Sequence, residues 1–202
     1  MFYQRKWEYD KCDKHTIFLS QAGYPIKGLH KVLEAMPLVL RHFPDARLRV
    51  AGQSIVDKPF YRMSGYGKYI QSLINKLSLN DKITFLGTLS EEEMCEQYLR
   101  TNVFICPSSI ENSPNSLGEA QIMGVPHLAA SVGGVPDMMK GNEECLYRFE
   151  EIEMLAEKIC DVFSMSIYDE EQQIKTAHIR HSEAINSQTL FDVYNVIRKN
   201  IV

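Results

Sequence analysis

Two carboxylates, Glu111 and Glu119, stand eight positions apart in a stretch that is rich in small residues. Small residues at the start of a helix allow backbone N–H groups to approach an anion such as a phosphate. A carboxylate beside them can accept hydrogen bonds from the hydroxyl groups of a sugar. The carboxylates also have a purely structural interpretation, because glutamate favours the first turn of a helix. Ser116 and Glu119 have the spacing of a capping box.

A second stretch, residues 21–28, has the composition of an anion-binding loop. Gly23 and Gly28 allow close approach of the backbone, and Lys27 adds a positive charge just before a predicted helix. An ordinary turn with a solvated lysine would have the same sequence. The loop matches neither G-x-G-x-x-G nor the Walker A pattern, so the usual dinucleotide and P-loop interpretations are excluded.

The elements that must position these loops alternate along the chain. Apolar runs predict strands at residues 16–20, 47–51, 83–86, 102–106, 126–130 and 145–147. Helices are predicted at 28–43, 66–78, 116–123, near 137–139, and at 151–166, 169–182 and 188–200, with a further helix that starts at a capping box, Ser90 and Glu93. This alternation predicts an α/β fold with a doubly wound, Rossmann-like parallel sheet of six strands in the order 3-2-1-4-5-6.

That strand order predicts where a ligand binds. In a doubly wound sheet, ligands lie beyond the carboxyl ends of the strands where the strand order reverses, here between strands one and four. The loops at residues 21–28 and 107–115 should therefore meet, with Lys27 and Glu111 facing one cleft.

Composition excludes several other classes of protein. The chain has 202 residues, 45% of them hydrophobic, and 22 basic against 26 acidic side chains give a net charge of −4. An acidic balance argues against a nucleic-acid partner, and no apolar run is long enough to span a bilayer. The five cysteines are scattered and odd in number, which indicates free thiols in a reducing cytoplasm.

Residues 17–139 resemble the donor-binding, C-terminal domain of retaining glycosyltransferases of the GT-B fold, family 4 (glycosyltransferase group 1). The most specific element is Glu111, seven residues and then Glu119. The other matching segments are Lys27-Gly28, Phe85-Leu86-Gly87, Pro107-Ser108-Ser109, Gly124-Val125-Pro126 and Val132-Gly133-Gly134-Val135.

The resemblance implies a role for each matching residue. Lys27 would pair with the diphosphate of a UDP- or GDP-sugar, Glu111 would contact the transferred sugar near the reacting carbon, and Glu119 would bind the ribose hydroxyls. The remaining donor-binding set is Gln21, Gly23 and Gly52, the backbone N–H groups of Asn115, Ser116 and Leu117, and Thr88 and Leu89. Main-chain atoms near Thr88 and Leu89 would line the base pocket. No metal or cofactor is implied, and the sequence contains no Asp-x-Asp.

One position departs from the family pattern. Family members commonly carry an arginine where this chain has Gln21, and its loss should weaken stabilisation of the leaving diphosphate. Lys58 and Arg62, after the second strand, are candidates to replace that charge.

The resemblance also implies that this chain is half of an enzyme and inactive alone. Residues 1–15 would be a leader or interdomain segment, and residues 16–202 the donor-binding domain with C-terminal helices. A missing N-terminal domain would bind the acceptor (a polysaccharide, glycolipid or other glycoconjugate) and provide any peripheral membrane association. The alternative is a non-catalytic nucleotide-sugar-binding module. A flavodoxin-like receiver is disfavoured, because Leu19-Ser20-Gln21-Ala22 offers no acidic residue at the end of strand one.

Overall fold

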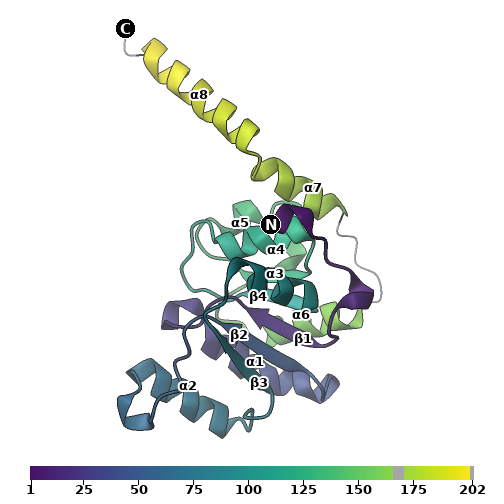
Figure 1. The fold of residues 1–202 in the computed structure, drawn as a ribbon, viewed down its shortest axis with the longest axis vertical. Coiled ribbons are helices and arrows are strands. Elements are labelled where there is room, and N and C mark those ends of the chain that lie inside the picture. The colour runs from purple at the N-terminus through teal and green to yellow at the C-terminus, as the bar shows by residue number, and fades with distance from the viewer. Residues whose placement is uncertain (166–170, 201–202) are drawn as a thin grey trace.

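The centre of the molecule is a six-stranded parallel sheet, in a computed structural model that describes residues 1–165 and 171–200 (Figure 1). The strands run in the order β3-β2-β1-β4-β5-β6. They are β1 (Thr16–Leu19), β2 (Arg47–Ala51), β3 (Ile83–Gly87), β4 (Val103–Cys106), β5 (His127–Ala130) and β6 (Leu146–Tyr147). The fold class and strand order predicted from the sequence are therefore confirmed.

Helices cover both faces of this sheet. Ile17 and Leu19 of β1 pack into a core with α1 (Leu29–His42), α2 (Gly65–Lys76) and α6 (Ile152–Ser164). Phe18, between them, belongs to the opposite core with α3 (Glu91–Arg100), α4 (Asn115–Met123) and α5 (Val135–Met138). Because successive strand residues point to opposite faces, β1 is buried on both sides, as expected for a central parallel strand.

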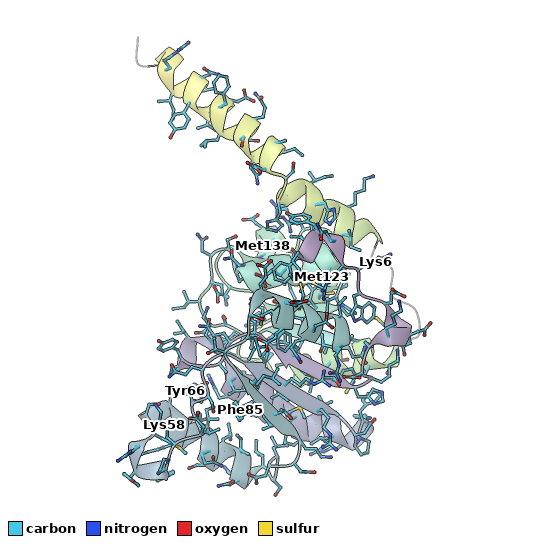
Figure 2. The ribbon with its side chains drawn as sticks, viewed as in Figure 1. Lys6, Lys58, Tyr66, Phe85, Met123 and Met138 are labelled. Carbon is cyan, nitrogen blue, oxygen red and sulfur yellow. The ribbon has the colours of Figure 1, made fainter. Side chains whose placement is uncertain are left out.

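The N-terminal segment packs against the second core. Trp7 is 1% exposed, its ring N–H donates to the Thr101 carbonyl at 2.7 Å, and its backbone N–H donates to the Met123 carbonyl at 2.9 Å. Figure 2 shows Met123, Met138 and Lys6 in the upper part of the sheet domain. The segment expected to be a leader or interdomain piece thus lies against the sheet domain.

The C-terminal helices differ in their contacts. α7 (Glu171–Arg180) packs on α4, whereas α8 (Glu183–Asn200) extends away from the sheet domain (Figure 1). Residue 166 of one predicted helix and residues 169–170 of the next lie outside the described residues. In the part of the chain that the structure describes, no helix combines the length and apolar character needed to cross a membrane.

Local sequence signals at the helix ends had mixed outcomes. The capping box of Ser90 and Glu93 at the start of α3 is confirmed, with both reciprocal hydrogen bonds formed. The capping box suggested for Ser116 and Glu119 is wrong. α4 begins at Asn115 after Pro114, without a side-chain cap, and the Glu119 carboxylate has another partner, described below.

Candidate functional site

The loops that follow β1 and β4 are in direct contact at the carboxyl edge of the sheet. Gly28 has a φ of +72°, and a Cβ atom there would lie 1.7 Å from the Pro107 carbonyl oxygen. The Ser109 N–H donates to the Ile26 carbonyl at 2.8 Å. Glycine is therefore required at position 28 both by the backbone conformation and by the close approach of the second loop.

This contact brings together the lysine and the first glutamate predicted from the sequence. Lys27 Nζ donates to Glu111 Oε1 at 2.5 Å, and the two side chains are only 24% and 14% exposed. Ser108 Oγ donates to the same carboxylate oxygen at 2.8 Å. The prediction that Lys27 and Glu111 face one cleft is confirmed, and the two side chains are bonded to each other.

A third loop, after β5, fixes the backbone of Glu111. The Gly134 N–H donates to the Glu111 carbonyl at 3.2 Å. A Cβ atom at Gly133, whose φ is +52°, would lie 1.9 Å from the same carbonyl oxygen. The Gly133-Gly134 turn thus packs directly against the Glu111 backbone, while Lys27 and Ser108 bond its carboxylate.

The second glutamate lies in α4, near the start of the helix. Glu119 Oε2 accepts a hydrogen bond from the hydroxyl of Tyr98 at 3.0 Å. Burial raises the pKa of the Glu119 carboxyl, and the hydrogen bond from Tyr98 opposes this rise.

The backbone at the start of α4 only partly matches its expected role. The Leu117 N–H already donates to the Pro114 carbonyl at 3.1 Å, and the Leu117 side chain is fully buried in the core. The N–H groups of Asn115 and Ser116, the first two positions of the helix, have no helical acceptor and are the ones left for an anion.

Two cavities share the side chain of Gln21. The smaller, of about 30 Å³, is lined by Gln21, Lys27, Glu111 and Ser116, among others. The larger, of about 300 Å³, is lined by Gln21 and Gly23 together with Lys58 and Arg62 from the segment after β2. Figure 2 shows Lys58 at the end of the molecule formed by α2, away from Met138.

The remaining predicted residues lie along the same edge but in different surroundings. Gly52, at the end of β2, donates its N–H to the Gly87 carbonyl at 2.8 Å and lies beside Gln21. Thr88 is exposed after β3, and Leu89 packs against the second core. In the strand order, β3 is separated from β1 by β2, so a ligand that reached all of these residues would have to extend across three strands.

Other reactive groups lie outside this site or are shielded within it. Burial, with Glu111 next in importance, raises the pKa of the Cys106 thiol to about 11, which makes it a poor nucleophile. All five cysteines are free. The described residues contain no group of three or more His, Cys, Asp or Glu side chains that could hold a metal ion.

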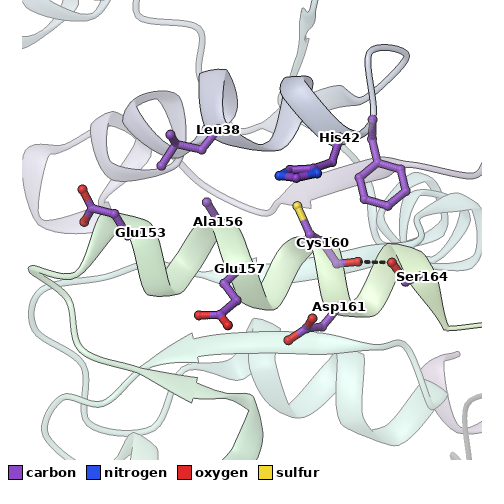
Figure 3. A pocket seen from close by; sticks show the side chains of 9 residues that line it. Leu38, His42, Glu153, Ala156, Glu157, Cys160, Asp161 and Ser164 are labelled. Carbon is purple, nitrogen blue, oxygen red and sulfur yellow. Dashed lines mark hydrogen bonds between the residues drawn. The ribbon is translucent and has the colours of Figure 1, made fainter.

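A cavity of about 490 Å³ between α1 and α6 is remote from the candidate site (Figure 3). Leu38, His42 and Phe43 line it from the end of α1, and Glu157 and Cys160 line it from α6. Because α1 starts at the carboxyl edge and runs back along the sheet, its last turn lies toward the opposite edge. None of the predicted site residues lines this cavity.

Sequence reasoning missed two side chains that support the site. Ser108 holds Glu111, and Tyr98 holds Glu119. A signal existed for Tyr98, because it falls on the apolar face of its helix and a buried tyrosine hydroxyl usually needs a partner. No pattern near Ser108 indicated which side chain it would contact.

Residues 3–180 match the family described as Glycosyl transferases group 1. The chain therefore belongs to this family, and the resemblance inferred from the sequence is confirmed at that level. It is 31% identical over 117 residues to the sulfoquinovosyl transferase SQD2 of Arabidopsis thaliana, an alignment that covers 58% of this chain and 20% of the plant protein.

Two solved structures have a similar fold. Sucrose-phosphate synthase from Thermosynechococcus elongatus aligns with a TM-score of 0.76 and 20% identity, over 98% of this chain and 51% of its own. HepE of Anabaena, in complex with UDP and glucose, aligns with a TM-score of 0.73 and 20% identity, over 90% and 48%. The chain thus spans about half the length of these structures.

Proposed function

We propose that this chain is the donor-binding part of a retaining glycosyltransferase that transfers a sugar from a nucleoside diphosphate sugar to an acceptor. The observation that carries this proposal is the meeting of Lys27 and Glu111 where the strand order reverses, 2.5 Å apart. The UDP complex of the similar HepE fold supports UDP as the first nucleotide to test, with GDP second.

The geometry gives each charged group a task in this reaction. As the bond between the sugar and the diphosphate breaks, positive charge grows at the anomeric carbon and negative charge on the leaving phosphate. The Glu111 carboxylate would stabilise the first charge and the Lys27 ammonium the second. Glu119 would accept hydrogen bonds from the ribose, and the free N–H groups of Asn115 and Ser116 would bind a phosphate or the sugar.

Lys58 and Arg62 would supply the cation that Gln21 does not. They line the larger cavity together with Gln21, and neither forms an ion pair within the described part of the chain. We further propose that the acceptor is bound by an N-terminal domain, that the reaction needs no metal, and that it takes place in the cytoplasm, where five free thiols stay reduced.

Calorimetry of the chain with UDP, GDP, ADP and their sugars tests donor binding. We expect weak binding, with a Kd of about 1 mM or −4 kcal/mol, because the chain spans only half of its structural neighbours. Lys27→Ala should abolish it, whereas Lys140→Ala, at an exposed lysine outside both cavities, should not. A chelator should have no effect. Equal binding by wild type and Lys27→Ala would refute the proposed site.

A non-catalytic nucleotide-sugar-binding module is the second candidate, and Gln21 is the observation that favours it. The retained pair of Glu111 and Glu119 opposes it. Single-turnover transfer by a protein that contains both halves separates the two: donor binding without transfer to any acceptor would identify a binding module.

A further inference from the structure

Tyr98 contacts the site from the interior of the protein. It lies on α3, is fully buried, and its ring packs edge-on against Phe18 of β1 and Phe104 of β4, with ring centroids 5.3 Å away in each case. Phe2 of the N-terminal segment adds a third edge contact at 6.1 Å. Rings on three sides leave the tyrosine ring little freedom, so its hydroxyl has one fixed position.

That hydroxyl lies between two oxygen atoms of α4. It is 3.0 Å from Glu119 Oε2 and 3.0 Å from the Ser116 carbonyl oxygen. A tyrosine hydroxyl has one proton to donate, and a charged carboxylate is the stronger acceptor of the two. The proton is therefore directed to Oε2 when Glu119 is ionised, which leaves Oε1 to accept from an incoming hydroxyl group.

We propose that Tyr98 is a positioning residue for nucleotide recognition, which holds Glu119 so that its carboxylate accepts hydrogen bonds from the ribose hydroxyls. This inference rests on the proposed function, in which Glu119 binds the ribose. In this proposal Tyr98 does not contact the ligand itself and acts only through Glu119.

The same contact links the two parts of the site. Ser116, whose carbonyl lies beside the Tyr98 hydroxyl, also lines the small cavity with Lys27 and Glu111. The Tyr98 hydroxyl thus holds the residue assigned to the ribose and lies beside the helix turn that also lines the small cavity.

Electrostatics is consistent with this role. Burial, with Glu119 next, raises the pKa of Tyr98 well above its usual range, so its hydroxyl remains a donor at neutral pH. Its hydrogen bond lowers the pKa of Glu119 against the effect of burial. Removing the hydroxyl should raise the pKa of Glu119 and leave its carboxylate without a fixed direction.

Tyr98→Phe tests the proposal, and Tyr147→Phe is its matched control. Tyr147 is also almost fully buried, and its hydroxyl has no hydrogen-bond partner among the described residues. Each variant removes one buried hydroxyl and keeps the ring, and thermal melting verifies that both fold. Calorimetry compares UDP with 2′,3′-dideoxyuridine diphosphate, which lacks both ribose hydroxyls.

We expect Tyr98→Phe to weaken UDP binding about tenfold, as for a lost charge-assisted hydrogen bond, with no change for the dideoxy analogue. Tyr147→Phe should leave both affinities unchanged. In a Glu119→Gln background, Tyr98→Phe should have a much smaller effect. If Tyr98→Phe leaves the ratio of the two affinities unchanged, whether both fall equally or neither changes, the proposal is overturned.

A measurement without ligand separates this inference from the proposed function. Carbon-13 NMR of the glutamate carboxyl groups should show a higher pKa for Glu119 in Tyr98→Phe but not in Tyr147→Phe. If wild type binds both nucleotides equally, the ribose role of Glu119 is wrong. If the pKa of Glu119 does not move in Tyr98→Phe, the positioning role of Tyr98 is wrong.

Discussion

Replacing Glu111 with glutamine should strengthen nucleotide binding while it damages catalysis. Glu111 neutralises Lys27 at 2.5 Å, and both side chains are largely shielded from water. A diphosphate that pairs with Lys27 must compete with this carboxylate and is also repelled by it. Glutamine keeps the size of the side chain and removes the charge, so both obstacles decrease.

The structure allows an estimate of this gain. A phosphate oxygen and a Glu111 oxygen that contact the same ammonium lie roughly 5 Å apart, and at an effective dielectric constant of ~20 two like charges at that distance repel by about 3 kcal/mol. Residual exposure of 24% and 14% admits some solvent screening. Halving the repulsion leaves about 1.5 kcal/mol, or roughly tenfold tighter binding.

Titration of UDP into wild type and Glu111→Gln by calorimetry, at low and high salt, measures this effect. Glu34→Gln is the control, because it removes a carboxylate that lies 3.9 Å from Lys31 on α1, outside both cavities. In a complete enzyme, Glu111→Gln should reduce turnover about 10²–10³-fold. A folded Glu111→Gln protein that binds UDP no more tightly than wild type would refute the idea that Glu111 masks Lys27.

Three further predictions concern the scaffold. Gly28→Ala should destabilise the fold by at least ~2 kcal/mol in urea unfolding, because its Cβ would meet the Pro107 carbonyl. Gly65→Ala is the control and should be close to neutral, because an added Cβ there has no neighbouring atom within 4 Å. Burial lowers the pKa of His127 to about 4 in the folded protein. As the pH falls, the imidazole is therefore protonated in the unfolded chain before it is protonated in the folded one, and the free energy of unfolding should fall by about 3 kcal/mol between pH 6.5 and 4. A His127→Gln variant with the same dependence of stability on pH would contradict this. Trp7, the only tryptophan, should show blue-shifted fluorescence that resists quenching, and Trp7→Ala should lower the free energy of unfolding by about 3–5 kcal/mol. Quenching as efficient as that of free tryptophan would show that the N-terminal segment does not pack against the sheet domain.

The sheet could be predicted because each strand has a local signature. Val103, Phe104, Ile105 and Cys106 form an apolar run that ends at Pro107, and such a run, buried on both faces, is typical of a parallel strand. Strand order then followed from general rules of connection, which do not depend on individual side chains. The meeting of Lys27 and Glu111 is a consequence of that order and was predicted with it.

The partners of the two glutamates could not be predicted in the same way. Ser116 and Glu119 fit a local capping pattern, but an N-cap contributes only about 1 kcal/mol. An unsatisfied buried hydroxyl costs about 1–3 kcal/mol, and the buried hydroxyl of Tyr98, on the preceding helix, donates to the Glu119 carboxylate, which is a stronger acceptor than a neutral carbonyl. The hydrogen bond between Tyr98 and Glu119 therefore prevails over the local capping box. No residue within four positions of Glu119 in the sequence indicates that Tyr98 is its partner.

The two glutamates occupy electrostatic environments that suit different chemistry. Glu111 is balanced by a full positive charge and by Ser108, so its charge is already compensated within the protein. Splitting that ion pair costs free energy, and a ligand recovers this energy only if it brings a negative group to Lys27 and a positive one to Glu111. A nucleotide sugar meets both conditions only as its glycosidic bond breaks, when the phosphate gains negative charge and the anomeric carbon becomes positive. Glu119 is instead held by a neutral hydroxyl in a half-buried position, and burial there opposes charge. A carboxylate of that kind is suited to neutral hydroxyl donors, which are present in the ground state and the transition state alike. On this reasoning we expect Glu119 to contribute to affinity and Glu111 to rate, although only eight positions separate them in the chain.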